Sequence, residues 1–227
     1  MTIKNLLSAV ALFAASVTTA SAATYAYTGD PNRVGNGGSV SALSSTYNSD
    51  TERLTWSVSD AKTANGNAAD GFWLVINGSG PNPKSIAPNT LAVLYADFSS
   101  SKLLAYSYNA QNNTSSVAGT LLQDFSSDLS VSGDTFGFDI DVSGLNNMFA
   151  APWEGMAYGD LIGVWFHFSS GTSLTPGQSF NFRQQAWYDT AFEKPEQTTV
   201  VPIPAAAFLF APVLAGFIAT RRRLKAK

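Results

Sequence analysis

The sequence has no cysteine, a single histidine and few charges: only 13% of its 227 residues are charged. Without cysteine, disulfides, thiolate metal sites and cysteine nucleophiles are all excluded. The fold must then depend on its hydrophobic core, and a chain of this length can bury a substantial one. No Gly-x-Ser-x-Gly turn accompanies the lone His167. We therefore interpret it as a strand residue with a neighbouring partner and not as the base of a serine triad.

Basic residues are scarce between the two ends of the chain. Six of the 13 lysines and arginines lie in the terminal segments, which contain no acidic residue. The region between them keeps seven basic and 16 acidic side chains, a net charge of −9. A body of this charge repels phosphate backbones and shows no basic stripe, which argues against nucleic acid as a partner.

The first 22 residues have the pattern of a secretory signal peptide. Lys4 precedes an apolar stretch from Leu6 to Val17, and Ala20-Ser21-Ala22 then gives the A-x-A pattern. This stretch of about 12 residues is too short to span a bilayer, which needs roughly 20. We predict that residues 1–22 are exported by the Sec machinery and cut by signal peptidase after Ala22. The alternative is a buried core helix.

The end of the chain has the pattern of a membrane-spanning helix. No charge occurs from Val200 to Thr220, and five basic residues follow. A helix of these 21 residues spans roughly 30 Å at about 1.5 Å per residue. The positive-inside rule places the basic cluster in the cytoplasm and the preceding domain outside the inner membrane. A plain permanent anchor is the simplest interpretation.

The start of this segment also carries a short proline motif. Its motif residues and its arginine cluster are Val201, Pro202, Ile203, Pro204, Ala205, Arg221, Arg222 and Arg223. Residues 201–227 thus resemble the PEP-CTERM group of bacterial sorting signals in its V-P-x-P-A variants, although Ile203 stands where the best-known form has Glu. The resemblance implies recognition by an exosortase, an integral-membrane transpeptidase, with cleavage near the prolines. The product would reach the cell envelope or the extracellular matrix.

Between the ends, the pattern predicts strands almost throughout. "RLTWSVS" alternates apolar and polar residues, whereas "GFWLVING" and "LAVLYADF" are continuous apolar runs, typical of strands covered on both faces. Further strands are expected in "KLLAYSYNA", "DTFGFDIDVSG", "DLIGVWFHFSS" and "SFNFRQQAWYD". Four tryptophans fall within these strands and are expected in the core: Trp56, Trp73, Trp165 and Trp187.

These strands predict one all-β domain over residues 23–192, a β-sandwich or jelly roll. Residues 193–200 are expected to be a polar spacer, followed by the sorting signal at 201–227. The stretch from "DGFWLVING" to "LLAYSYN" resembles concanavalin-like or DOMON-like sandwiches, which include sugar-binding modules.

Two carboxylates stand out within the predicted strands. Asp139 and Asp141 lie two positions apart and so point to the same face. Such a pair could serve glycoside hydrolysis together with Glu154, or bind calcium through its oxygens. The alternative is a solvent-facing row opposite the apolar Phe138 and Ile140.

The longest expected loop contains the remaining ligand-binding candidates. Exposed rings of Trp153 and Tyr158 would stack on a sugar, with Asn146 and Glu154 bonding its hydroxyls. A separate loop holds Asp60, Asn65, Asn67 and Asp70 but lacks the D-x-[DN]-x-[DN]-G calcium spacing, so we interpret it as a turn-rich connection.

The sequence thus predicts an exported, non-catalytic β protein that binds extracellular polysaccharide and needs no cofactor. Two alternatives stay open: a purely structural envelope protein, and a glycan-cleaving hydrolase that uses Asp139 or Asp141 with Glu154.

Overall fold

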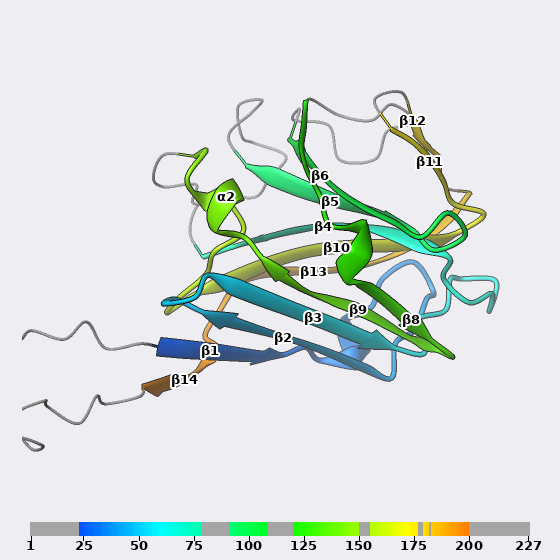
Figure 1. Cartoon of the computed structure of the whole chain (residues 1–227). Coiled ribbons are helices and arrows are strands. Elements are labelled where there is room, and N and C mark those ends of the chain that lie inside the picture. The colour runs from blue at the N-terminus through cyan, green and yellow to red at the C-terminus, as the bar shows by residue number, and fades with distance from the viewer. Residues whose placement is uncertain are drawn as a thin grey trace, which may run out of the picture. The chain divides into compact units, whose positions relative to one another are not determined.

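Two six-stranded antiparallel sheets make up most of the structure (Figure 1). It is a computed structural model and describes residues 23–78, 91–108, 120–149, 155–176, 179–181 and 183–199. Residues 23–198 form one compact unit. The expected signal peptide and sorting signal, together with Trp153 and Glu154, lie outside the described residues.

The first sheet has the strand order β14-β1-β2-β3-β9-β8, and the second has the order β13-β10-β4-β5-β6-β7. In these two sheets and in the separate β11–β12 hairpin, the strands are β1 (Ala23–Thr28), β2 (Ala42–Asn48), β3 (Arg53–Ser59), β4 (Gly71–Asn77), β5 (Ala92–Asp97), β6 (Lys102–Ser107), β7 (Leu121–Asp124), β8 (Leu129–Ser132), β9 (Thr135–Asp141), β10 (Ile162–Ser170), β11 (Ser173–Thr175), β12 (Ser179–Asn181), β13 (Gln184–Glu193) and β14 (Glu196–Thr199). The described helical elements are short: η1 (Pro31–Arg33), η3 (Ser126–Asp128) and α2 (Ser143–Asn146). Within the described residues, no helix has the length and apolar character to span a bilayer.

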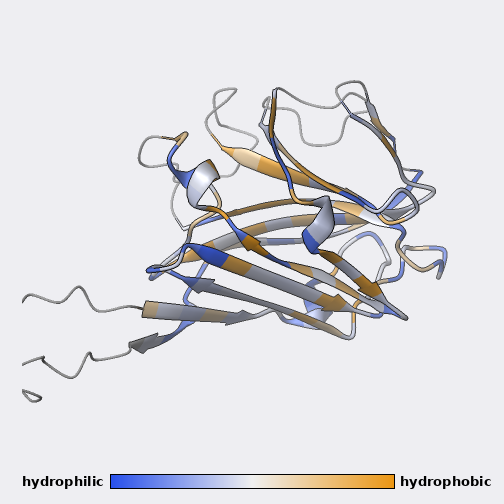
Figure 2. Ribbon diagram, in the orientation of Figure 1, coloured by the Kyte–Doolittle hydropathy of each residue, from blue (hydrophilic) through white to orange (hydrophobic). Residues whose placement is uncertain are grey.

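The first sheet is half-buried, as the alternating pattern predicts. In β3, Leu54, Trp56 and Val58 are buried, while the residues between them are more exposed. The strand pairs with β2 through a short turn, so the two strands form a hairpin. Figure 2 shows the alternation as separate orange patches along β3. Such a pattern arises because one face of the sheet packs on the core and the other meets solvent.

The inner faces of the two sheets share one hydrophobic core. The ring of Phe166 in β10 lies 5.3 Å from that of Trp56 in β3 and 5.6 Å from that of Phe72 in β4. Phe72 in turn stacks on Phe136 of β9 with 5.5 Å between ring centroids. These rings bridge the two sheets and give the fold a β-sandwich-like arrangement.

The second sheet is buried on its outer face too. Every residue of β4 and β5 is buried, as their continuous apolar runs predict. A second hydrophobic cluster covers this face, and the β11–β12 hairpin contributes Leu174 and Phe180 to it. The ring of Phe180 lies 4.8 Å from that of Tyr95 in β5. The hairpin therefore covers part of the second sheet.

Asp97, at the end of β5, links this hairpin to the sheet by a hydrogen bond. Its carboxylate accepts hydrogen bonds from the backbone N–H of Leu174 at 3.1 Å and of Ser99 at 3.0 Å. It also accepts one from the hydroxyl of Ser99 at 2.7 Å and one from the N–H of Ser100 at 3.2 Å. Burial opposes ionisation of this carboxyl, but the hydrogen bonds outweigh it and hold the pKa of Asp97 below its usual value.

The structure differs from the sequence-based expectation in two segments. "SFNFRQQAWYD", expected as one strand, forms the two strands β12 and β13. Residues 193–200 were expected to form a polar spacer. This expectation is wrong for residues 196–199, which form β14 and pair with β1 at the edge of the first sheet. Backbone hydrogen bonds supply this pairing, so an exposed edge strand can be polar and leave no hydrophobic alternation to detect.

Candidate functional site

Asp139 and Asp141 point to solvent from the first sheet. The carboxylate of Asp139 forms an ion pair with Arg53, whose Nε lies 3.0 Å from Oδ1. Asp141 accepts a hydrogen bond from the backbone N–H of Ser143 at 3.0 Å, and its bonding to Ser143 lowers the pKa of Asp141. The neighbouring Phe138 and Ile140 are buried. The two aspartates therefore form the solvent-facing row that was one of the sequence interpretations.

Tyr158 is a core residue. It is only 3% exposed, and its hydroxyl donates to the hydroxyl oxygen of Ser45 at 3.1 Å. Its ring packs against Tyr47 with 5.5 Å between centroids. The expectation of an exposed ring at this position is wrong, because the segment turns the tyrosine back between the sheets.

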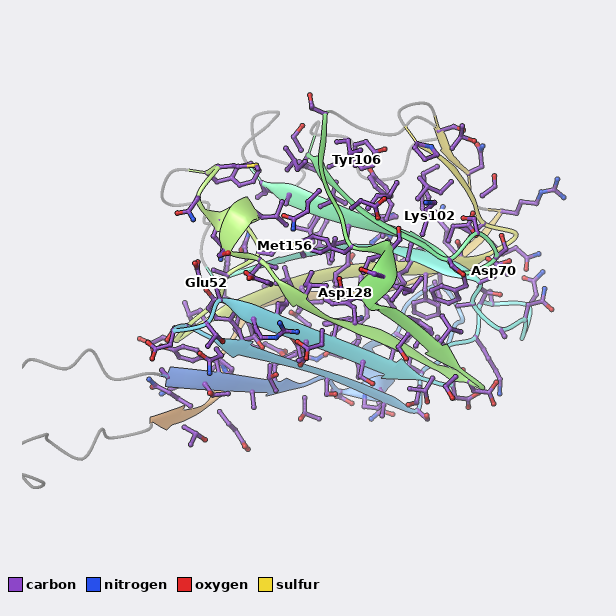
Figure 3. The ribbon with its side chains drawn as sticks, in the orientation of Figure 1. Glu52, Asp70, Lys102, Tyr106, Asp128 and Met156 are labelled. Atoms are coloured by element: carbon purple, nitrogen blue, oxygen red, sulfur yellow. The ribbon has the colours of Figure 1, made fainter. Side chains whose placement is uncertain are left out.

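Asn146, the last residue of α2, links neighbouring segments at one end of the sheets by hydrogen bonds. Its Nδ2 donates to Oε1 of Glu52 at 2.9 Å, and its Oδ1 accepts from the backbone N–H of Met156 at 3.0 Å. Glu52 and Met156 are labelled at this end in Figure 3. The amide that the sequence assigned to ligand hydroxyls is thus engaged in holding the fold together.

In the loop that holds Asp60, Asn65, Asn67 and Asp70, both carboxylates contact other groups of the protein. Asp60 pairs with Lys62 at 2.8 Å, and Asp70 accepts the backbone N–H groups of Gly171 and Thr172 at 2.7 and 2.9 Å. Among the described residues, no cluster of three acidic or histidine side chains could hold a metal ion.

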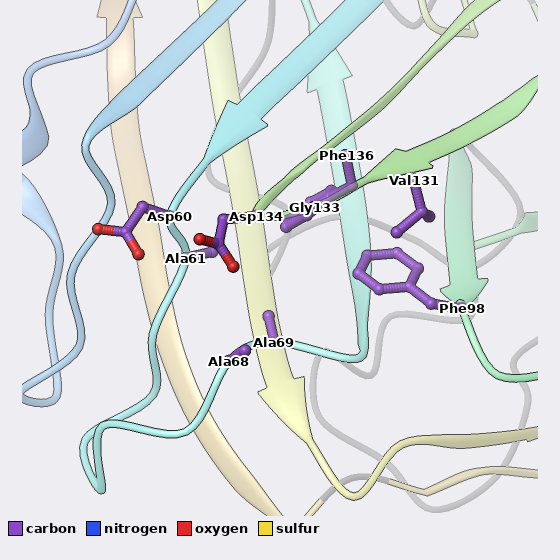
Figure 4. A pocket seen from close by; sticks show the side chains of 9 residues that line it. All are labelled: Asp60, Ala61, Ala68, Ala69, Phe98, Val131, Gly133, Asp134 and Phe136. Carbon is purple, nitrogen blue, oxygen red and sulfur yellow. The ribbon is translucent and has the colours of Figure 1, made fainter.

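A small hollow lies beside this loop (Figure 4). It is lined by Asp60, Ala61, Ala68, Ala69, Phe98, Val131, Gly133, Asp134 and Phe136. Its volume is about 40 Å³, room for only a few water molecules, each of which needs roughly 10–15 Å³ on the same measure. The hollow is therefore too small for a sugar ring.

A row of three rings on the outer face of the second sheet has the features of a binding surface. His167 in β10 is the direct cross-strand partner of both Trp73 in β4 and Trp187 in β13. The centroid of the His167 ring lies 4.1 Å from that of Trp73 and 5.9 Å from that of Trp187, and each pair of planes is inclined by 29°. Trp73 is 3% exposed and Trp187 is 37% exposed. The row thus runs from the buried middle of the sheet to an open ring on β13.

Asp189 adds a polar group to this row. His167 Nε2 lies 3.1 Å from Oδ1 and 3.3 Å from Oδ2 of Asp189, which confirms the expected partner for the lone histidine. The other ring nitrogen, Nδ1, is buried and has no hydrogen-bond partner in the described part of the chain. No hydroxyl there completes a nucleophilic triad. The Asp189 side chain is 34% exposed, so its oxygens can be reached from solvent.

The loop at 34–38 holds the Trp187 indole in place. The backbone N–H of Gly35 donates to the carbonyl of Trp187 at 2.8 Å, and Nδ2 of Asn36 donates to the carbonyl of Gln185 at 2.6 Å. A Cβ atom added to Gly35 would lie 2.3 Å from Nε1 of Trp187. Only glycine allows the indole to approach this backbone so closely.

The inner face of β13 is anchored to the first sheet. The hydroxyl of Tyr188 lies 2.8 Å from that of Tyr27 in β1, and Tyr27 donates to Oε2 of Glu193 at 2.5 Å. Arg33 forms an ion pair with the same Glu193. Burial and the hydrogen bond to Glu193 raise the pKa of Tyr27, so its hydroxyl stays protonated. The strand β13, which carries Trp187, therefore contacts both the loop at 34–38 and the first sheet.

Trp187 is the functional candidate that sequence reasoning missed. Trp56, Trp73 and Trp165 are buried as expected, but the core assignment of Trp187 is wrong. Its alternation with the buried Ala186 and Tyr188 places it on the outer face. The sequence does not reveal that β13 is the last strand of its sheet, where Trp187 has β10 on one side and the loop at 34–38 on the other.

No family model, curated protein or solved structure significantly matches this chain. Its function is therefore inferred from the geometry of the site and from the pattern of the two ends.

Proposed function

We propose that the chain is an exported, non-catalytic protein of the cell envelope or extracellular matrix that binds a neutral polysaccharide. The observation that carries this proposal is the Trp187 indole, 37% exposed at the open end of a row of stacked rings. An aromatic face of this kind offers a flat apolar surface to the C–H face of a sugar, and polar groups beside it fix the orientation. The oxygens of Asp189 can accept hydroxyl hydrogen bonds there.

The charge of the chain favours a neutral ligand. Between the terminal segments the net charge is −9, which would repel an anionic polymer. At the site itself, the carboxylate of Asp189 is in contact with His167 Nε2. We also propose that the fold is of the concanavalin-like or DOMON-like type. Its support is the pair of six-stranded antiparallel sheets around a shared core.

Replacing the open indole tests the binding proposal. The Trp187→Ala variant should bind about tenfold or more weakly to the polysaccharide that the wild-type protein retains, because it removes the stacking surface. Binding is measured by affinity electrophoresis through gels that contain dextran, starch, xylan or a soluble cellulose derivative.

Leu121→Ala is the matched control, because Leu121 is also exposed (47%) but lies on β7 at the far edge of the same sheet. It should leave binding unchanged. Trp153→Ala is tested in parallel. Loss of binding in Trp153→Ala but not in Trp187→Ala would move the site to the 150–154 segment. Absence of binding to every gel would favour the purely structural alternative.

For the two ends, we propose Sec export, removal of residues 1–22 by signal peptidase, and recognition of 201–227 by an exosortase. The C-terminal helix would anchor the chain in the inner membrane until processing. The patterns of the two ends of the sequence support this proposal.

Mass spectrometry of the protein from its own cells tests the processing. The expected mature chain begins at Ala23 and ends near Pro204. A chain that lacks residues 1–22 but retains 205–227 would indicate a plain membrane anchor, and an intact 227-residue chain in the cytosol would exclude export.

A further inference from the structure

A second exposed aromatic ring lies on the same face of β13. Phe192 is 40% exposed. A β-bulge between Ile162 and Val164 shifts the pairing of β10 with β13, so that Gly163 lies opposite this part of the strand. The Phe192 ring lies beside Gly163, because a Cβ added at Gly163 would be 3.5 Å from Cε1 of Phe192, an ordinary van der Waals contact. The phenyl ring thus lies on the outer face of the sheet, next to Gly163.

Trp187 and Phe192 mark two separate points along β13, the edge strand of the second sheet. Trp187 is paired with His167, and Phe192 lies over Gly163, four positions away along β10. At about 3.3 Å per residue, these positions are ~13 Å apart. A single sugar ring cannot span this distance. Asp189 lies on the same face between the two rings.

The surface between the two rings matches the chemistry of an uncharged, hydroxyl-rich chain. The carboxylate of Asp189 faces His167. The carboxylate of Glu193 turns toward Tyr27 and Arg33. What β13 presents outward here is therefore two partly exposed aromatic rings with the Asp189 carboxylate between them.

From this arrangement we infer that the site binds a linear polysaccharide laid along β13, with Trp187 and Phe192 stacking on two different sugar units of one chain. A monosaccharide or a chain end would meet only one of the rings. This inference rests on the proposed function, since it takes the same site to be a glycan site.

An oligosaccharide length series tests the inference on the full-length protein. The series runs from the disaccharide to the hexasaccharide of whichever polysaccharide the protein retains, and binding is measured by titration calorimetry. The wild-type protein should bind the hexasaccharide about tenfold more tightly than the disaccharide, because only the longer ligand reaches both rings. Phe192→Ala should weaken hexasaccharide binding about three- to tenfold and leave disaccharide binding at Trp187 unchanged.

Two further variants separate the ring from general effects on the fold. Phe192→Tyr keeps the aromatic face and should retain the wild-type affinity for the hexasaccharide. Phe192→Leu keeps apolar area without that face and should bind the hexasaccharide as weakly as Phe192→Ala. Equal affinity for short and long ligands, with Phe192→Ala indistinguishable from the wild type, would overturn this inference and leave the glycan site at Trp187 standing. Absence of binding to any ligand of the series and to the parent polysaccharides would overturn both.

Discussion

Phe166→Ala is expected to lower the free energy of unfolding by about 3–5 kcal/mol. Phe166 is fully buried, and its ring contacts Trp56 across the sandwich and Phe72 on the neighbouring strand. Truncation removes this apolar area from the core and leaves a cavity that close-packed neighbours can fill only in part. Chemical denaturation of the purified protein, followed by tryptophan fluorescence, measures the loss.

Phe192→Ala is the matched control for this change. It deletes the same atoms from a ring that is 40% exposed, so the unfolding free energy should fall by about 1 kcal/mol or less. If both variants lost the same stability, the shared core of the two sheets would not depend on Phe166 as described. The same control also shows whether Phe192→Ala is folded when its glycan binding is measured.

Asp97→Ala should lower the free energy of unfolding by about 2–4 kcal/mol at neutral pH. The carboxylate accepts hydrogen bonds from three residues, and its removal leaves the buried N–H of Leu174 without its partner. The β11–β12 hairpin should lose protection first. Hydrogen exchange detected by mass spectrometry would therefore show faster exchange over residues 173–181 than over β4 or β10.

The effect of Asp97 should also depend on pH. Because the folded state holds the pKa of Asp97 below its ordinary value of 3.8, the unfolded chain takes up the proton first as the pH falls. The stability that Asp97 contributes is thus fully present above about pH 4 and is lost as the pH falls below it. The difference between the wild type and Asp97→Ala should therefore stay constant between pH 6 and about pH 4 and shrink as the pH falls further toward pH 2.

Asp139→Ala provides the comparison for a carboxylate on the surface. Asp139 is paired with Arg53, but both side chains are about half exposed, and such pairs contribute about 1 kcal/mol or less. A loss in Asp139→Ala as large as that in Asp97→Ala would contradict the assignment of Asp97 as the residue that fastens the hairpin.

Local pattern was sufficient to predict much of the fold. Alternation in "RLTWSVS" predicted a half-buried strand, and the continuous runs of β4 and β5 predicted strands covered on both faces. These signals work because the side-chain period of a strand is two and because each face of a sheet either meets the core or does not. The Ser- and Thr-rich β2 and the polar β14 carry weaker signals, since their pairing depends on backbone groups that every residue has.

The candidate site was less accessible to sequence reasoning than the fold. The sequence predicted a neighbouring partner for His167, but nothing local identifies it as Asp189, 22 residues later. Tyr158 lies in a stretch that reads as a loop from its sequence, yet its side chain is buried between the sheets. Burial of such a residue depends on which distant strand it meets.

By itself, the sequence determined that this protein is built from strands and has no thiol chemistry, and the patterns of its two ends predict export and sorting. These properties follow from composition, period and the order of short motifs, which need no knowledge of distant contacts. Only the tertiary structure decided that Trp73, His167 and Trp187 form one row, and that its last ring lies open. Strand order and register bring these rings together, and both are set by the packing of the whole chain.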